Sequence, residues 1–395
     1  MSKIKVLQIA HASHSYFADG KDDLKAITLN DWYFKTASQI KKFHPEIEVE
    51  CWAPEKDWEK YREFKEGGIK MRFFPATFSP RYALDFSIPM LLEIAREIKK
   101  AEKEGYKLII HLHEYHNLHG LIISLLFGGK KIVAQHHGGS WPLKHLEENK
   151  NYRRGFLFFL LGQIAENVLL KRVKVFYALS KQEMEYLKEI SPNSKVVFQT
   201  MGIGDEYFEN MDKNVARKKL GISKDKKILL FIGRVAEEKG VKYLLEAMKE
   251  IEKYNDKIEL KIIGYGKEKD SLEKYSKELE LKKVEFLGGK FGEEKMLYLS
   301  AADVLILPSL KEGAPVTVME AMARNLPSIV SQVGGVELMI KNNKNGIIIS
   351  PKNTREIIES VKKILKWKSI KIKKYAEQYK WEEIIKNTLE DYKRI

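Results

Sequence analysis

The sequence predicts an α/β protein built on two doubly wound parallel sheets, and three observations indicate this fold. Short apolar runs alternate with amphipathic stretches through both halves of the 395 residues, which is typical of parallel strands joined by helical crossovers. The alternation restarts at Lys227 with ILLFIG. The intervening segment, residues 201–226, is polar. A chain of this length can form two domains, each with its own core.

Thirteen segments have the composition of buried strands. In the first half they are residues 5–9, 48–52, 71–74, 108–111, 132–135, 173–178 and 196–199. In the second half they are residues 227–233, 260–264, 284–288, 304–307, 328–330 and 346–349. Two amphipathic helices close the chain, and Trp381 and Ile384 lie on an apolar face of the second. We therefore expect an N-terminal domain over residues 1–205, a C-terminal domain over 206–375, and a terminal helix over 376–395 that packs back toward the N-terminal domain.

Composition and charge favour a globular protein of the cytoplasm. The chain is 44% hydrophobic and carries a formal charge of +15 that is spread evenly over both halves, whereas a nucleic-acid site would concentrate it, so we expect no nucleic-acid partner. A single cysteine, Cys51, excludes an internal disulfide. Because the chain begins with a strand-like run, we expect no signal peptide. Its most apolar run, residues 155–165, is shorter than the roughly 20 residues that span a bilayer.

The segment 308–337 carries the clearest candidate site. A buried strand precedes Pro308, a turn follows, and a helix is predicted from Pro315 to Arg324, with Pro315 at its first position. Glu312 then lies in the loop ahead of the helix, and Glu320 lies more than a turn inside it. Because the first turn of a helix has unpaired N–H groups, an anionic ligand resting there would meet one carboxylate at each end.

Two cations follow the strand near residue 230. Arg234 comes directly after Gly233, and Lys239 precedes the next helix. Arginine and lysine beside a helix start are suited to phosphate oxygens. Gly264 and Gly266 follow the next strand, where a nucleotide could lie against bare backbone, although the third glycine of a dinucleotide fingerprint is missing. Taken alone, each pattern also fits an ordinary turn.

In order and spacing, the segments GRVAEEKG, IIGYG, VEFLGG and PSLKEGAPVTVMEAMARNLPSIVSQVGGVELMIKNNKNGIII resemble the nucleotide-sugar-binding half of retaining GT-B glycosyltransferases of family 4, the glycosyl transferases group 1. The resemblance covers roughly residues 227–350. It implies the GT-B fold, in which two Rossmann-like domains face each other across a cleft. It also implies transfer of a sugar from a UDP- or GDP-linked donor to a hydroxyl of a glycan or lipid-linked acceptor, in cell-surface polysaccharide or glycoconjugate synthesis.

The resemblance implies roles for single residues. Glu320 would hold the ribose hydroxyls, Glu312 would lie beside the donor sugar, and Arg234 with Lys239 would bind the diphosphate. The residues expected around the donor are Gly233, Gly264, Gly266, Gly313, Ala314, Pro315 and Glu320. Ala314 and Pro315 stand where relatives often have Gly or Phe, so the donor sugar stays open. Relatives of this type need no bound metal and no DxD-type motif is present, so we expect neither metal nor cofactor.

Histidines dominate the first half, in HLHEYHNLHG and AQHHGGSW. Spacings of three residues, as between His113 and His116 or His116 and His119, could place two imidazoles on one helix face for a metal, but a polar cleft lining is the simpler interpretation. By resemblance, His137 before Gly138 would point at the donor sugar, and His113 is a weaker match to a second family histidine. The expected catalytic residues are His137, Glu312, Arg234 and Lys239. A double displacement with Glu312 as the nucleophile is the alternative to direct transfer.

The N-terminal loop HASHSYFADGKDD lacks the Gly-Gly pair of many relatives, and we expect acceptor contacts from His11, His14 and Tyr16, with His113 on the same side. Residues 151–174 place Arg153 and Arg154 beside an apolar stripe. That stripe suits peripheral contact with the inner face of an anionic membrane, but a core helix explains it as well and is favoured. Two other functions stay open: an acceptor-independent enzyme such as an epimerase or hydrolase, and a non-catalytic nucleic-acid-binding protein.

Overall fold

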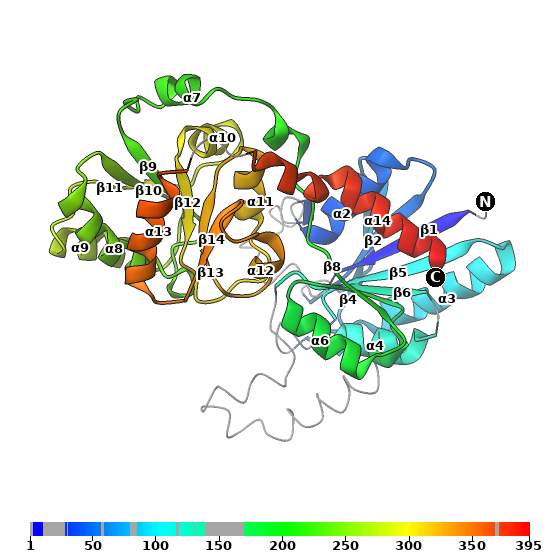
Figure 1. Ribbon diagram of the computed structural model, residues 1–395. Coiled ribbons are helices and arrows are strands. Elements are labelled where there is room, and N and C mark those ends of the chain that lie inside the picture. Colours follow the sequence, from blue (N-terminus) through cyan, green and yellow to red (C-terminus); the bar gives the residue numbers. More distant parts are fainter. Residues whose placement is uncertain are drawn as a thin grey trace, which may run out of the picture. The chain divides into compact units, whose positions relative to one another are not determined.

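A computed structural model of the chain describes residues 3–10, 28–29, 31–56, 59–79, 85–115, 118–129, 131–138, 170–367 and 371–395. Contacts divide the chain into two units. The N-terminal unit comprises Met1–Met201 with Ile384–Ile395, and the C-terminal unit comprises Gly202–Glu383. Each unit is an α/β layer structure around one twisted sheet (Figure 1).

The sheet of the N-terminal unit has the strand order β3-β4-β2-β1-β5-β6-β7-β8. Its strands are β1 (Ile4–Ile9), β2 (Glu48–Glu55), β3 (Arg62–Glu66), β4 (Ile69–Pro75), β5 (Lys107–His113), β6 (Ile132–Gln135), β7 (Val175–Ala178) and β8 (Lys195–Phe198). All neighbours pair parallel except β3, which pairs antiparallel with β4. The order in which strands are added to the sheet therefore reverses between β1 and β5, and the carboxyl ends of these two parallel strands lie side by side.

Strand β3 is absent from the sequence prediction. Its residues, REFKE, are mostly charged and largely exposed, so they carry none of the apolar alternation that identifies a buried strand. This edge strand has β4 as its one neighbour in the sheet, and its charges discourage pairing with another chain.

The N-terminal unit is covered by the helices α2 (Trp32–Phe43), α3 (Ile88–Glu104), α4 (Leu118–Phe127), α6 (Lys181–Ile190) and most of α14 (Trp381–Arg394). Helix α3 is delimited by its own sequence. Ser87 accepts a hydrogen bond from the Met90 N–H at the start, and Gly105 adopts φ 73° just past the end, where glycine has no steric penalty.

Helix α14 docks on the sheet of the N-terminal unit through both apolar and polar contacts. Ile385, Leu389 and Tyr392 are fully buried. The hydroxyl of Tyr177 on β7 donates to Asp391 at 3.1 Å, and Lys195 on β8 pairs with the same carboxylate at 2.5 Å. The last 12 residues of the chain thus belong to the same core as the first strand.

The sheet of the C-terminal unit has the order β11-β10-β9-β12-β13-β14, and all pairs are parallel. Its strands are β9 (Lys227–Ile232), β10 (Ile258–Ile263), β11 (Val284–Gly288), β12 (Val304–Leu307), β13 (Ser328–Ser331) and β14 (Gly346–Ile349). The prediction located each of them to within two residues at either end. This order is that of a doubly wound Rossmann fold, whose switch point lies between the first and fourth strands, here β9 and β12.

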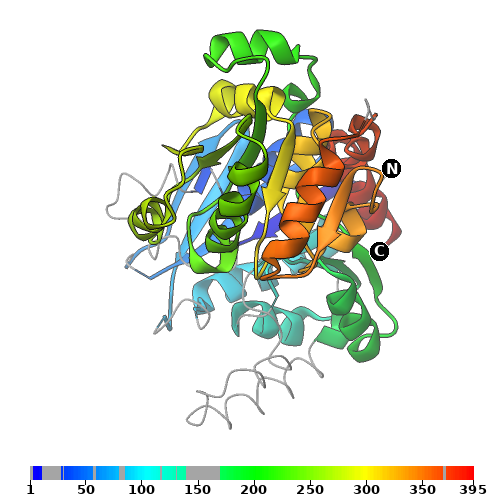
Figure 2. The same ribbon diagram turned by 60° about the vertical axis from the view of Figure 1, so that its left-hand side comes forward.

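Helices cover both faces of this second sheet. They are α7 (Lys213–Lys219), α8 (Val241–Tyr254), α9 (Lys269–Glu278), α10 (Gly292–Ala301), α11 (Val316–Ala323), α12 (Val336–Met339) and α13 (Thr354–Ile364). Helices α8 and α13 lie side by side on one face, in front of the sheet in Figure 2. Helix α7 packs on α10, near the amino ends of β9 and β12.

Helix α11 starts one residue later than predicted. Pro315 is its N-cap rather than its first helical residue, and the Val318 N–H donates to the Pro315 carbonyl at 3.0 Å. The proline still suits the position, because the lost N–H would have no partner inside the helix in either register.

Candidate functional site

The loops that follow β9 and β12 pack against each other at the switch point of the C-terminal sheet. The Leu310 N–H donates to the Glu238 carbonyl at 2.8 Å. Gly240 has φ 64°, and a Cβ there would overlap the carbonyl oxygen of Pro308. Main-chain contact between these loops brings the residues near 239 and 312 together, at the carboxyl ends of the strands where doubly wound folds bind ligands.

Glu312 and Lys239 form an ion pair at this point. Lys239 Nζ lies 2.7 Å from Glu312 Oε1, and the Ser309 hydroxyl donates to the same oxygen at 2.7 Å. The side chains of Lys239 and Glu312 are 16% and 9% exposed. Lys239, a predicted site residue, therefore holds the Glu312 carboxylate in place. Ser309, which the sequence analysis did not identify, holds it as well.

Glu320 is paired with a second lysine. It lies buried in α11, with Lys295 Nζ of α10 at 2.7 Å from Oε1 and 2.5 Å from Oε2. Tyr207 faces the pair, with Lys295 Nζ 5.7 Å from its ring centroid. Burial, followed by the charge of Glu320, raises the pKa of Tyr207, so its hydroxyl stays protonated and can donate to the carboxylate. Neither Lys295 nor Tyr207 belongs to a recognisable motif, since both are distant from Glu320 in sequence.

Arg234 occupies a different environment from Lys239. Its side chain is 74% exposed, and its guanidinium pairs with Glu238 four residues later at 2.9 Å. It lies on the same loop as Lys239. The side chain can therefore reach an anion at the carboxyl edge of β9 only by leaving Glu238, which costs little for an exposed pair.

The glycines after β10 are required by packing within the domain. A Cβ at Gly264, where φ is 148°, would overlap the carbonyl oxygen of Gly233, and one at Gly266 would overlap that of Val235. The Val235 N–H also donates to the Tyr265 carbonyl at 2.7 Å. At Gly233, by contrast, the nearest atom to an added Cβ is 3.4 Å away, in the Phe231 ring. Close approach of the two loops thus explains Gly264 and Gly266 without a ligand.

The backbone of Glu312 and Gly313 is supported by a loop that the sequence analysis passed over. Gly334 has φ 58°, and a Cβ there would overlap the Glu312 carbonyl. The Gly335 N–H donates to the Gly313 carbonyl at 2.6 Å. The GG pair after β13 was the available signal, because a left-handed residue beside another backbone requires glycine. Gly313, Ala314 and Pro315 lead from this contact directly into α11.

In the N-terminal unit, two predicted histidines meet at the carboxyl ends of β5 and β6. His113 Nδ1 lies 2.7 Å from His137 Nε2, and the two rings are parallel to within 2°. The backbone N–H of His137 donates to the Glu114 carboxylate at 2.6 Å. The Trp32 ring of α2 stacks on the His137 ring, with 5.8 Å between the ring centroids. His113 Nε2 lies 2.5 Å from Gln8 Oε1. The ring of His137 is thus held from several sides.

The remaining described histidines of the cluster have different surroundings, although the His111 ring stacks on His113 at 4.6 Å. Burial lowers the pKa of His119 to about 4, and burial with the charge of His137 lowers that of His111 to about 3. His136 Nδ1 instead contacts the buried carboxylate of Glu183 at 3.0 Å. His113 ends a strand rather than lying on a helix. Within the described ranges, no group of three or more His, Cys, Asp or Glu side chains could hold a metal ion.

Several predicted residues lie outside the described part of the chain. They are His11, His14 and Tyr16 of the N-terminal loop, His116, and residues 151–169 of the apolar stripe with its two arginines. Among the helices that are described, none is long and apolar enough to cross a bilayer.

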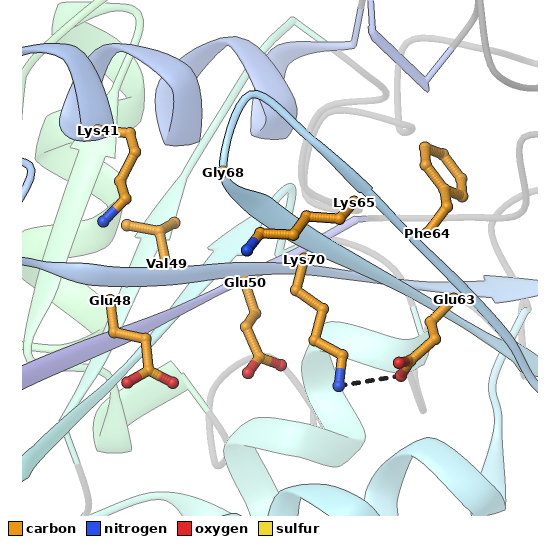
Figure 3. Close-up of a pocket in the computed structure, with 9 residues that line it drawn as sticks. All are labelled: Lys41, Glu48, Val49, Glu50, Glu63, Phe64, Lys65, Gly68 and Lys70. Atoms are coloured by element: carbon orange, nitrogen blue, oxygen red, sulfur yellow. Dashed lines mark ion pairs between the residues drawn. The ribbon is translucent and has the colours of Figure 1, made fainter.

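A hollow of about 350 Å³ lies elsewhere in the N-terminal unit (Figure 3). It is lined by Lys41, Glu48, Val49, Glu50, Glu63, Phe64, Lys65, Gly68 and Lys70. Lys70 pairs with Glu63 at 3.0 Å, while Glu48 and Glu50 pair with Lys5. Glu48 begins β2, so the hollow lies toward the amino end of that strand, opposite the edge where the histidines meet. Its three carboxylates are thus already paired with lysines.

Comparison with known proteins identifies the C-terminal unit. Residues 212–381 match the sequence profile of the family described as glycosyl transferases group 1. These residues form a group 1 glycosyltransferase domain. Arg234, Lys239, Glu312 and Glu320 all lie within it, as do Lys295 and Gly334, whereas His113 and His137 precede it.

Curated relatives match about half of the chain. An uncharacterized glycosyltransferase of Methanocaldococcus jannaschii is 37% identical over 186 residues, which are 45% of this chain and 47% of that protein. A putative teichuronic acid biosynthesis glycosyltransferase of Bacillus subtilis is 30% identical over 190 residues, 47% of this chain and 46% of that protein. The matched segment thus spans about half the length of these relatives.

Solved structures resemble the chain over its whole length. Sucrose-phosphate synthase from Thermosynechococcus elongatus superposes with a TM-score of 0.69 and 19% identity, covering 100% of this chain and 99% of that one. HepE from Anabaena, in complex with UDP, gives a TM-score of 0.69 with 16% identity and full coverage of both chains. The group 1 domain and the N-terminal unit together therefore have the GT-B type of fold, with two Rossmann-like domains.

Proposed function

We propose that the chain is a retaining glycosyltransferase of family 4. It moves a sugar from a UDP- or GDP-linked donor to a hydroxyl of a glycan or lipid-linked acceptor. The observation that carries the proposal is the Lys239–Glu312 ion pair at 2.7 Å, located at the switch point of the group 1 domain. HepE, which has a similar fold, was solved with UDP. These observations support a donor site at the carboxyl edge of β9 and β12.

A diphosphate suits this edge electrostatically. Lys239 is 16% exposed and neutralised by Glu312, so an incoming phosphate would share or replace that partner. Arg234 adds a mobile, exposed guanidinium from the same loop. Arginine and lysine stabilise the negative charge that develops on a departing diphosphate, which is the main electrostatic requirement of sugar transfer. Both cations are therefore assigned to the diphosphate.

The two glutamates take separate parts of the donor. Glu320, ionised beside Lys295, accepts hydrogen bonds from the ribose hydroxyls, and Glu312 lies by the sugar with Gly313, Ala314 and Pro315. Gly233, Gly264 and Gly266 form the adjoining loops on which the nucleotide rests. Retention follows if the acceptor hydroxyl enters on the face that the diphosphate leaves, with a phosphate oxygen taking the acceptor proton. In the alternative chemistry, Glu312 attacks the sugar and forms a covalent intermediate.

The N-terminal unit supplies His137 and the acceptor. His137 orients the donor sugar, and His113 supports it. The acceptor contacts are assigned to His11, His14 and Tyr16. The enzyme works in the cytoplasm, and residues 151–174 are the segment through which it would touch a membrane that carries a lipid-linked acceptor.

A thermal-shift panel tests the donor site. Purified protein is heated with UDP, GDP, UDP-glucose or GDP-mannose, and at least one should raise the unfolding temperature, since ligands that bind only the folded state stabilise it. Glu320→Gln should abolish that rise. Glu294→Gln is the matched control, because Glu294 pairs with Lys290 at 2.7 Å and is exposed. The absence of any rise across the panel would refute the proposal.

Product analysis separates transfer from the acceptor-independent reactions. The nucleotide sugar that stabilises the protein is incubated with and without an acceptor alcohol, and the anomeric configuration of the product is read by proton NMR. Transfer with retention gives a glycoside of unchanged configuration. An epimerised nucleotide sugar would assign the chain to acceptor-independent chemistry instead.

A further inference from the structure

A continuous series of buried polar contacts connects His137 with the C-terminal helix. His137 Nε2 lies 2.7 Å from His113 Nδ1, and His113 Nε2 lies 2.5 Å from Gln8 Oε1. Gln8 Nε2 lies 3.4 Å from the Tyr392 hydroxyl, which lies 2.6 Å from His111 Nδ1. We call these five residues the polar chain. Gln8, His111 and Tyr392 are 0% exposed and His113 is 1% exposed, so water does not compete for these bonds.

The three internal residues of the polar chain are His113, Gln8 and Tyr392. Each donates a hydrogen bond to one neighbour in the chain and accepts one from the other. Burial raises the pKa of Tyr392, so its hydroxyl keeps its proton and gives that proton to one neighbour only. Burial lowers the pKa of His111 to about 3, so its ring is neutral and carries one N–H. Gln8 offers an amide N–H on one side and a carbonyl oxygen on the other. The hydrogen bonds must therefore all point the same way along the chain.

The orientation of the Gln8 amide decides the direction. Its nitrogen lies 3.4 Å from the Tyr392 hydroxyl and its oxygen 2.5 Å from His113 Nε2, so the Tyr392 oxygen accepts from Gln8. The Tyr392 hydroxyl then donates to His111 Nδ1, and the single proton of the neutral His111 ring is on Nε2.

The contact between the two imidazole rings follows from the same amide, whose carbonyl oxygen faces His113. His113 must then donate through Nε2, and in a neutral imidazole its Nδ1 is an acceptor. The only proton available for the contact between the two rings is one on His137 Nε2.

We propose that Gln8 and Tyr392 are positioning residues, which hold His113 as its Nε2–H tautomer and thereby fix the proton of His137 on Nε2. The nitrogen of His137 that can accept a hydrogen bond is then Nδ1. The consequence for catalysis rests on the proposed function: with its tautomer set, His137 receives a sugar hydroxyl as a hydrogen-bond acceptor rather than presenting a second N–H. The tautomers themselves rest on the contacts alone.

This assignment gives α14 a part in the chemistry. Tyr392 lies near the end of the chain and Gln8 near its start, on the central strand β1. The plane of the His137 ring is set separately, by Trp32 stacking and by the bond from its backbone to Glu114. Different residues thus control the plane of the His137 ring and the position of its proton. Only the position of the proton depends on Gln8 and Tyr392.

Nitrogen-15 NMR of histidine-labelled full-length protein tests the tautomers. At about pH 8, where ordinary imidazoles are neutral, His113 and His137 should both have the chemical shifts of Nε2–H rings in the wild type. His113→Gln and His137→Gln assign the signals. Nδ1–H shifts for either ring in the wild type would overturn the proposal.

Two variants test the positioning residues. Tyr392→Phe keeps the ring but removes the hydroxyl, so the Gln8 amide can turn over and Nδ1–H signals should appear for His113 and His137. Gln8→Leu should have the same effect; if it fails to fold, Tyr392→Phe still decides. Tyr177→Phe is the matched control, because Tyr177 is equally buried and its hydroxyl bonds to Asp391 of the same helix at 3.1 Å, outside the polar chain. Unchanged tautomers in Tyr392→Phe would overturn the role of Tyr392.

Turnover gives a readout that distinguishes the two proposals. On the nucleotide sugar that stabilises the wild type, Tyr392→Phe should lower kcat about ten- to a hundredfold with little change in KM, as for residues that orient a histidine through its other nitrogen. Tyr177→Phe should retain wild-type kcat. Equal kcat in Tyr392→Phe and Tyr177→Phe would refute a catalytic consequence. A wild type that turns over no nucleotide sugar would refute the proposed function. The tautomer assignment would still be tested by NMR, which does not depend on turnover.

Discussion

The ammonium group of Lys295 lies 2.7 Å from one carboxylate oxygen of Glu320 and 2.5 Å from the other, with the Glu320 side chain 6% exposed. A buried carboxylate of this kind stays ionised only with a partner that neutralises it. Lys295 on α10 therefore neutralises the charge of Glu320 on α11. Under the proposed function, the ribose-binding carboxylate depends on a partner from another helix.

Replacing Lys295 should destabilise the group 1 domain. Lys295→Met leaves the Glu320 carboxylate buried without its cation, and losses of about 3 kcal/mol are usual when one member of a buried pair is removed. Urea unfolding at neutral pH measures the change. Lys290→Met is the control, since the Lys290–Glu294 pair is more exposed and its loss should change the free energy of unfolding much less. Equal losses in the two variants would mean that the Lys295–Glu320 pair is not specially buried.

Alanine substitutions at the two loop glycines Gly264 and Gly233 should differ in their effect on the free energy of unfolding. Gly264→Ala forces a Cβ against the Gly233 carbonyl at φ 148°, and we expect a loss of about 2 to 3 kcal/mol in the free energy of unfolding. Gly233→Ala meets nothing nearer than 3.4 Å and should cost under about 1 kcal/mol. Thermal unfolding without ligand makes the comparison. A stable Gly264→Ala protein would contradict the packing of these two loops.

Arg234 should contribute to donor binding but not to folding. Its side chain is 74% exposed, so Arg234→Ala should change stability by less than about 0.5 kcal/mol. Under the proposed function, the loss of one cation from the diphosphate should weaken nucleotide affinity about tenfold, which corresponds to about 1.4 kcal/mol. Isothermal titration with the stabilising nucleotide measures this. Lys224→Ala, at an exposed lysine in the turn before β9, is the control for a general effect of charge.

Stability should fall below neutral pH because of His119. Its pKa is lowered by burial to about 4 in the folded protein, while the unfolded chain binds a proton near the ordinary value of about 6.5. The unfolded state therefore holds more protons between these values, and stability present above about pH 6.5 is lost as the pH falls toward 4. The shift corresponds to roughly 3 kcal/mol.

His119→Leu should remove that part of the acid sensitivity. Among the described residues neither ring nitrogen of His119 has a hydrogen-bond partner, so leucine should cost little at neutral pH. Urea unfolding at several pH values compares wild type, His119→Leu and a control, His44→Gln, at a partly exposed histidine. A slope with pH that is the same in wild type and His119→Leu would contradict the assignment.

Local sequence determined much of the C-terminal unit. The apolar run VLIL predicts β12 to the residue, and the prolines and Asn325 predict α11 to within one residue of each end, since such signals act through the backbone of their own segment. The same reasoning located Lys239 and Glu312 in loops after two strands of one sheet, and the strand order makes those two strands neighbours. Strand β3 was missed because a charged edge strand has no apolar alternation to recognise.

Only the tertiary structure supplied the partners of the predicted residues. Lys295 precedes Glu320 by 25 positions on a different helix, and no spacing rule connects them. Gln8, His113, His137 and Tyr392 come from four separate segments, which meet because β1, β5 and β6 are neighbours in one sheet and α14 packs against it. Sequence patterns determine which residues can carry the chemistry, because charge and hydrogen-bonding capacity belong to each side chain. Which atom each one pairs with is decided by strand order and burial, because these set the distances and exclude water.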